Sequence, residues 1–304
     1  MQKIIPHLWF NTEASEAAAF YVTVFPESQV THTTVLHDTP SGDCDLLNFM
    51  LWGQEFMVIS AGPLFKFNPS VSFIVNYDPQ LFGDSEDEAK RSLDEAWTKL
   101  AEGGKALMPL QEYPFSKHYG WVQDKYGVSW QLMLTDPKGA PRPTITPSLL
   151  FTGDRCGQAE AAMKLYLSVF RQAQPGAVHR YPAGMAPDQE GTIMYADCQL
   201  EDKWFALMDS AHEHGFAFNE AISFMITCND QAEIDYYWKQ LSAVPEAEQC
   251  GWIKDQFGIS WQITSAEMET MMRESDQEQA DRIMKALMPM KKIDIAALKA
   301  AAKG

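Results

Sequence analysis

The sequence predicts an α+β protein made of two similar halves, followed by a short helical tail. Three observations support this fold class. The chain has 304 residues, enough for about two domains of ordinary size. A segment that begins at Gly120 returns in closely similar form at Gly251. Each half also alternates short apolar stretches of strand length with single amphipathic helices.

The repeat is clearest in the run GWVQDKYGVSWQL (residues 120–132), which returns as GWIKDQFGISWQI (residues 251–263). Seven of its thirteen positions are identical. Residues 65–73 and 6–10 also have counterparts at 216–224 and 147–151, in the same order. The spacings indicate that the second copy has lost about twenty residues before Gly251, and loops are where such changes are tolerated.

The first unit of the first half has the order β-α-β-β-β. Residues 4–10 form an apolar strand, and a helix begins at Thr12 and ends before Pro26. Strands follow at 30–36, 45–52 and 55–60, the last two joined by a turn at Gly53.

A second unit of the same order follows. It has a strand at 71–76, a helix at 86–100, and strands near Ala106, at 119–123 and at 129–134. We therefore expect domains at 1–136 and 147–265, each a pair of β-α-β-β-β modules. A proline-rich linker at 137–146 separates them, and a helical tail occupies 266–304. Methionines at helical spacing in the tail favour packing on a neighbouring domain, with an adaptable binding surface as the alternative.

Charge and composition exclude several classes of function. The chain has 41 acidic and 24 basic residues, a net charge of -17, which disfavours nucleic acid and anionic membranes as partners. No apolar run is long enough to span a bilayer. The five cysteines form no C-x-x-C pair, and residues 1–10 do not resemble a signal peptide. We expect an acidic, cytoplasmic protein with reduced thiols.

Three features together resemble a known family. They are Phe20-Tyr21 near the end of the first helix, the turn from Asp124 to Gly127, and the tandem motif itself. The chain resembles the PhnB-like branch of the vicinal oxygen chelate superfamily (VOC; glyoxalase/bleomycin resistance/dioxygenase). The resemblance implies that the two modules of each half curl into an incomplete barrel around a cavity. It also implies that the two copies pack as an internal pseudo-dimer; further pairing of whole chains stays open.

The resemblance implies a divalent-metal site on four strands. The corresponding positions are His7, Ser60, Ser70 and Gln131 in the first copy and Ser148, Asp209, Ala221 and Gln262 in the second. Carboxylates and imidazoles are the usual ligands of such ions, and most of these positions lack them. We therefore expect no metal and no other cofactor. The alternative is a metal-dependent lyase, isomerase or dioxygenase that combines His7 with Asp209 or Glu55.

Strand alternation suggests a ligand site instead. It places His7 with Trp9 on one strand face and Gln131 with Met133 on another. Aromatic, sulfur and hydroxyl groups of this kind suit a small, partly aromatic molecule. The predicted ligand-binding residues are His7, Trp9, Met50, Trp52, Ser60, Ser72, Gln131 and Met133, with Asp209 and Gln262 as second-copy equivalents.

Other interpretations stay open at this level. The same side chains could simply fill the barrel, the two glutamines could tie the last strand of each copy to its neighbours, and the tandem could have a purely structural or partner-binding role. No catalytic residue is assigned. Some relatives carry the label 3-demethylubiquinone-9 3-methyltransferase, but the pair Gly103-Gly104 follows a helix and not a strand, which disfavours methyl transfer. No G-x-S-x-G or phosphate-loop motif is present.

Overall fold

The computed structural model describes residues 2–39 and 41–304. The first copy consists of two modules. The first module comprises β1 (Ile4–Phe10), α1 (Ala14–Val24), β2 (Gln29–Thr39), β3 (Gly42–Leu51) and β4 (Gln54–Ser60). The second comprises β5 (Val71–Tyr77), η1 (Pro79–Phe82), α2 (Glu86–Ala101), β6 (Lys105–Tyr113), β7 (Ser116–Gln123) and β8 (Ser129–Leu134).

The second copy repeats this order and is followed by three tail helices. Its first module comprises β9 (Ile145–Phe151), η2 (Gly153–Arg155), α3 (Ala159–Val169), β10 (Ala173–Arg180), β11 (Ile193–Leu200) and β12 (Lys203–Asp209). Its second comprises β13 (Ile222–Cys228), α4 (Gln231–Leu241), η3 (Pro245–Ala247), β14 (Trp252–Lys254) and β15 (Ser260–Ser265). The tail consists of α5 (Ala266–Glu274), α6 (Gln277–Leu287) and α7 (Ile295–Lys303). The predicted α+β tandem fold is confirmed, although the last module has one strand fewer than expected because its loop is shorter.

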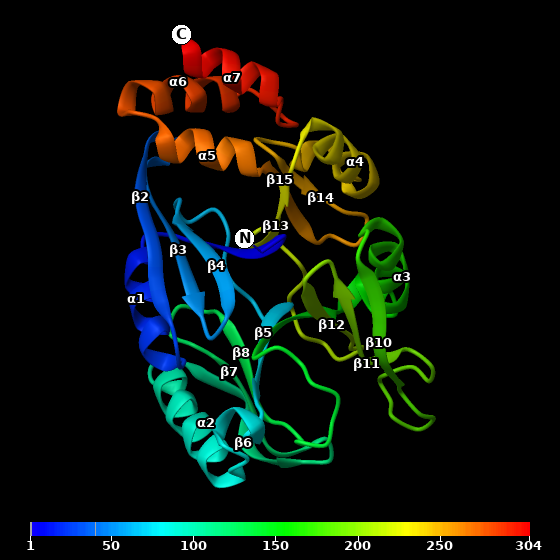
Figure 1. The fold of residues 1–304 in the computed structure, drawn as a ribbon. Helices are drawn as coiled ribbons and strands as arrows, with labels where there is room; N and C mark the ends of the chain where they lie inside the picture. The colour runs from blue at the N-terminus through cyan, green and yellow to red at the C-terminus, as the bar shows by residue number, and fades with distance from the viewer. Residues whose placement is uncertain (1, 40) are drawn as a thin grey trace.

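The two sheets are assembled across the copies. The first sheet has the order β14-β15-β13-β1-β4-β3-β2 and the second has the order β10-β11-β12-β9-β5-β8-β7-β6. Within each sheet, a strand of the first copy pairs with a strand of the second. In the first sheet β1 runs antiparallel to β13, and in the second β5 runs antiparallel to β9 (Figure 1). The expectation that both modules of one half share a barrel is therefore wrong. Each module begins with one strand, β1, β5, β9 or β13, and pairing across the copies covers the open edge of all four. The result is a pseudo-dimer within one chain.

Each sheet has an outer face that carries helices and an opposite face, which we call the inner face. On the outer face of the first sheet, Leu8 and Phe10 pack with Ala17 and Tyr21 of α1, and all four side chains are buried. Residues that alternate with these, such as His7 and Trp9 on β1, belong to the inner face.

The repeated motif builds a structural joint in each copy. The buried carboxylate of Asp124 accepts hydrogen bonds from the Tyr21 hydroxyl and the Trp130 indole, both at 2.8 Å, and from the amides of Tyr126 and Val128. Asp255 has the same four kinds of partner in the second copy. The motif therefore ties a helix, a turn and the last strand together.

The tail covers the edge that the shortened loop leaves open. The amides of Cys250 and Gly251 donate to the carbonyls of Met290 and Lys291 at 2.8 and 2.7 Å. Three methionines of α5 are partly buried against the core: Met268, Met271 and Met272. The helices α5, α6 and α7 lie together at one end of the molecule (Figure 1).

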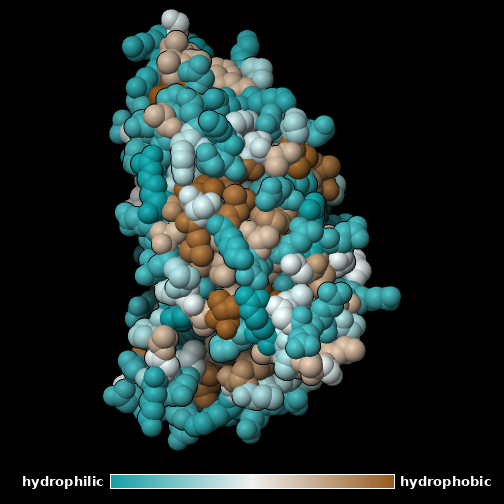
Figure 2. All heavy atoms as spheres, turned by 90° about the vertical axis from the view of Figure 1, so that its right-hand side faces the viewer, coloured by the Kyte–Doolittle hydropathy of each residue, from teal (hydrophilic) through white to brown (hydrophobic). Residues whose placement is uncertain are grey.

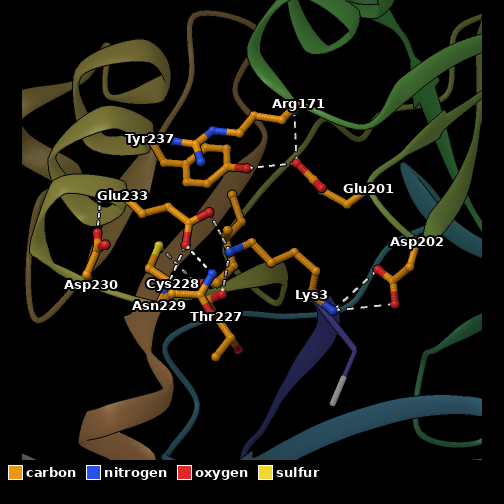
Figure 3. Close-up of polar contacts among 11 residues, drawn as sticks. Lys3, Arg171, Glu201, Asp202, Thr227, Cys228, Asn229, Asp230, Glu233 and Tyr237 are labelled. Carbon is orange, nitrogen blue, oxygen red and sulfur yellow. Dashed lines mark hydrogen bonds and ion pairs between the residues drawn. The ribbon is translucent and has the colours of Figure 1, made fainter.

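A buried polar network fastens β1 to the second copy (Figure 3). The Lys3 ammonium lies 2.8 Å from the Glu233 carboxylate and donates to the Thr227 carbonyl at 2.7 Å. The carboxylate of Glu201 accepts from the Arg171 amide and the Tyr237 hydroxyl. These contacts join the start of β1 to α4, and α4 to the β11–β12 turn.

Hydrophilic residues dominate the face drawn in Figure 2, and the hydrophobic ones gather near its middle. Among the described helices, none combines the length and apolar content that a membrane span requires.

Candidate functional site

The structure divides the predicted ligand-binding residues between the two sheets. His7, Trp9 and Met50 lie on the inner face of the first sheet. Ser72, Gln131 and Met133 lie on the inner face of the second. The prediction that they line one cavity is wrong, because β1 pairs with β13 of the second copy and not with a strand of its own second module.

Two predicted site residues, Trp52 and Ser60, have structural roles. Trp52 is buried, and its ring centroid lies 5.1 Å from that of Tyr77, so it joins the two modules of the first copy. The hydroxyl of Ser60 accepts a hydrogen bond from the Ala14 amide at 3.1 Å, at the start of α1. Both are therefore corrected from cavity residues to structural ones.

Asp209 is the second-copy counterpart of Ser60. Its carboxylate accepts hydrogen bonds from the amides of Gly157, Ala159 and Ile193 at 2.7, 3.1 and 3.0 Å. Burial raises the pKa of this carboxyl, although the three amides oppose that shift. These amides engage both carboxylate oxygens, and two of them lie at or just before the start of α3, so Asp209 caps that helix.

The inner face of the first sheet carries a polar row around His7. His7 lies opposite Ser223 on β13, which lies opposite Ser260 on β15, and Gln262 donates to the Ser223 hydroxyl at 2.9 Å. His7 is 4% exposed, and its Nδ1 has no hydrogen-bond partner. Its ring is perpendicular to that of Trp252, with the two ring centroids 5.6 Å apart. Burial lowers its pKa to about 3, so the imidazole is neutral at pH 7.

The inner face of the second sheet carries a similar row of polar side chains, with serine in place of the histidine. Ser148 lies opposite Ser72 and occupies the place that His7 has in the first sheet. Gln131 donates to the Ser72 hydroxyl at 2.7 Å and accepts from the Tyr119 hydroxyl at 2.7 Å. Both polar atoms of this amide are therefore engaged, as expected if Gln131 ties β8 to its neighbours.

These residues do not fit a divalent ion. Grouped by sheet, the implied positions are His7, Ser60, Ala221 and Gln262 in and beside the first sheet, and Ser70, Gln131, Ser148 and Asp209 in and beside the second. Asp209 is the one carboxylate among them, and three backbone amides already bind it. Within residues 2–39 and 41–304, no three His, Cys, Asp or Glu side chains gather closely enough to share an ion. His7 lies in the first sheet and Asp209 in the second.

A cavity of about 160 Å³ lies against the inner face of the second sheet, where the linker crosses it. We call it the linker cavity. Its walls include Ile74 and Met133 from neighbouring strands, Phe115 from the β6–β7 hairpin, and Thr146 and Tyr195 from the second copy. The Thr146 hydroxyl is buried and has no hydrogen-bond partner. Of the predicted residues, Met133 alone is among those that line this cavity.

The linker contributes Arg142, which the sequence interpretation missed. The guanidinium forms two hydrogen bonds with the buried Asp197 carboxylate, at 2.8 and 3.2 Å, and lies 3.9 Å above the Trp204 ring. The one available signal was an arginine within a proline-rich segment, and it does not reveal a partner fifty-five positions away.

A second, more open cleft of about 640 Å³ lies between the modules of the first copy. Trp9 borders it, together with Lys66, Lys105 and Lys125. Lys125 is paired with Glu16 at 3.3 Å, which reduces the positive charge that this cleft offers.

Comparison with known proteins identifies the family. Residues 2–133 and 143–264 each match the family described as 3-demethylubiquinone-9 3-methyltransferase. The chain belongs to this family. It is therefore a tandem PhnB-like protein with the fold of the vicinal oxygen chelate superfamily. Among curated proteins, none matches the chain.

Two solved structures are similar to this chain. A PhnB protein from Bacillus cereus is 37% identical, over 44% of this chain and 100% of its own, with a TM-score of 0.38. Glyoxalase I from Zea mays is 12% identical, over 86% of this chain and 93% of its own, with a TM-score of 0.52. The maize enzyme shows similarity of fold alone, and it spans both copies.

Proposed function

We propose that this tandem PhnB-like protein binds a small, partly aromatic molecule in the linker cavity through direct contacts, without a metal ion. The observation that carries the proposal is the unpartnered Thr146 hydroxyl, 3% exposed, on the wall of a cavity. A buried hydroxyl without a partner costs about 1–3 kcal/mol, which a bound polar group can offset.

The rest of the wall indicates the kind of molecule. Phe115 and Tyr195 present aromatic rings, and Ile74 and Met133 present flexible apolar surface, which suits an aromatic ring with a few polar atoms. The volume of about 160 Å³ lies below the roughly 300–1,000 Å³ of drug-sized sites, so the ligand is small. A cavity of this size does not support methyl transfer, because it is too small to hold a methyl-donor cofactor together with a substrate.

The test is a screen of small aromatic compounds against the full chain by ligand-observed NMR, with and without EDTA. We expect binding that survives EDTA and weakens in Thr146→Val, which keeps the shape and removes the hydroxyl. Ala140→Trp, at an exposed rim position, should block the cavity. His7→Ser should leave binding unchanged. Binding that disappears with EDTA and returns with a divalent ion would overturn the proposal.

A further inference from the structure

We infer that the ligand of the linker cavity is a small organic ammonium ion, an amine protonated at neutral pH on a short aromatic or apolar body. The inference rests on the proposed function and adds the charge of the ligand to it.

Two carboxylates line the cavity where two parallel strands end. β5 and β8 run parallel, with Tyr77 opposite Leu134, and Asp78 and Asp136 follow these strand ends. One oxygen of each carboxylate accepts a hydrogen bond from a nearby amide, at 2.9 Å in both cases. Among the described residues, neither forms an ion pair within 4.0 Å, so one oxygen of each can accept a hydrogen bond from a ligand.

Among the described residues that line the cavity, the one cationic side chain is already neutralised. Arg142 lines it, but its charge is balanced by the two hydrogen bonds to buried Asp197. Lys117 lies within electrostatic range of Asp136 and is itself paired with Glu86 at 2.9 Å. Among the described lining residues, an anionic ligand would therefore meet two carboxylates and no unpaired cation. The net charge of -17 acts in the same direction.

The uncharged polar groups of the wall also favour a hydrogen-bond donor. The side-chain amide of Asn76 donates to the Pro143 carbonyl at 2.7 Å, which leaves its oxygen as an acceptor. The Thr146 hydroxyl can accept as well as donate. An ammonium group has three N–H donors and no acceptor, so it complements this set, while its apolar body matches Ile74 and Met133.

Three probes that share a benzene ring and differ in charge test the inference: benzylamine is positive, benzyl alcohol is neutral and benzoate is negative. Their affinities for the full chain are measured by NMR titration at pH 7 and low salt. We expect benzylamine to bind at least tenfold more tightly than benzyl alcohol, and benzoate more weakly than either. Raising the salt from about 0.05 M to 0.5 M should weaken benzylamine binding and leave benzyl alcohol unaffected, because ions screen the exposed charges.

Variants locate the effect. Asp136→Asn, at an exposed position, should reduce benzylamine affinity at least threefold without changing that of benzyl alcohol, and Asp78→Asn should do the same. Asp281→Asn, on the exposed face of the tail, serves as the matched control. Equal affinity for the amine and the alcohol, or preference for benzoate, would overturn the inference and leave the proposed function standing. If neither these probes nor the wider aromatic screen binds, both fail.

Discussion

Acidification should destabilise this protein through His7. Its pKa is lowered to about 3 in the folded state by burial, against an ordinary value of 6.5. Between these two pH values the unfolded chain binds a proton that the folded protein excludes, so stability is complete above pH 6.5 and falls as the pH is lowered. One pKa unit corresponds to about 1.4 kcal/mol, so lowering the pH from 6.5 to 5 costs about 2 kcal/mol at this residue.

The perturbation is His7→Ser, which places in the first sheet the residue that Ser148 provides in the second. The free energy of unfolding is measured by urea denaturation at pH 7.5, 6.5, 5.5 and 5. The wild type should lose about 2 kcal/mol more than the variant between pH 6.5 and 5. His32→Ser, at an exposed position of the same sheet, is the control and should follow the wild type.

The dependence of the unfolding free energy on pH distinguishes the effect of His7 titration from the effect of lost packing. The cavity that serine leaves lowers stability equally at each pH. Equal pH dependence in His7→Ser and the wild type would refute the reasoning. Direct titration gives a second readout: the ring proton signals of His7 should not move between pH 8 and 5, whereas those of a freely titrating histidine do.

Four further substitutions, with one control, test the structural account. Lys3→Met leaves a buried carboxylate unpaired and should lower the free energy of unfolding by about 2–3 kcal/mol in urea melts; an unchanged midpoint would show that the network in Figure 3 contributes little. Asp124→Asn and Asp255→Asn each place an amide N–H group near the tyrosine and tryptophan donors of their joint, so each should lower the free energy of unfolding by about 2–4 kcal/mol. Thermal unfolding measures this loss, and a large difference between the two variants would contradict the equivalence of the two joints. Gly251→Ala would place Cβ 2.8 Å from the Ile263 carbonyl and should expose the tail to proteolysis. Gly215→Ala also has a positive φ but meets no atom within 4 Å, so it should leave the tail protected.

Much of the fold follows from local patterns in the chain. Strand 129–134 and helix 86–100 were predicted to within one residue, because apolar periodicity and glycine or proline boundaries depend on neighbouring residues. The repeat showed that the modules are duplicated, and strand alternation placed His7 and Trp9 on one face, and Gln131 and Met133 on another, because side chains alternate along any strand.

Only the tertiary structure decided which strands are neighbours. Alternation specifies the face on which a side chain lies, but not the strand that pairs beside it, so the sequence alone could not separate His7 from Gln131. The same limit concealed the linker cavity, where Thr146 lies opposite Ile74 of the first copy and Arg142 pairs with Asp197 of the second. Composition and periodicity determined the modules and their outer faces. The pairing of β1 with β13 and β5 with β9 determined which polar groups share a site, because hydrogen bonds between distant edges join residues that no local pattern connects.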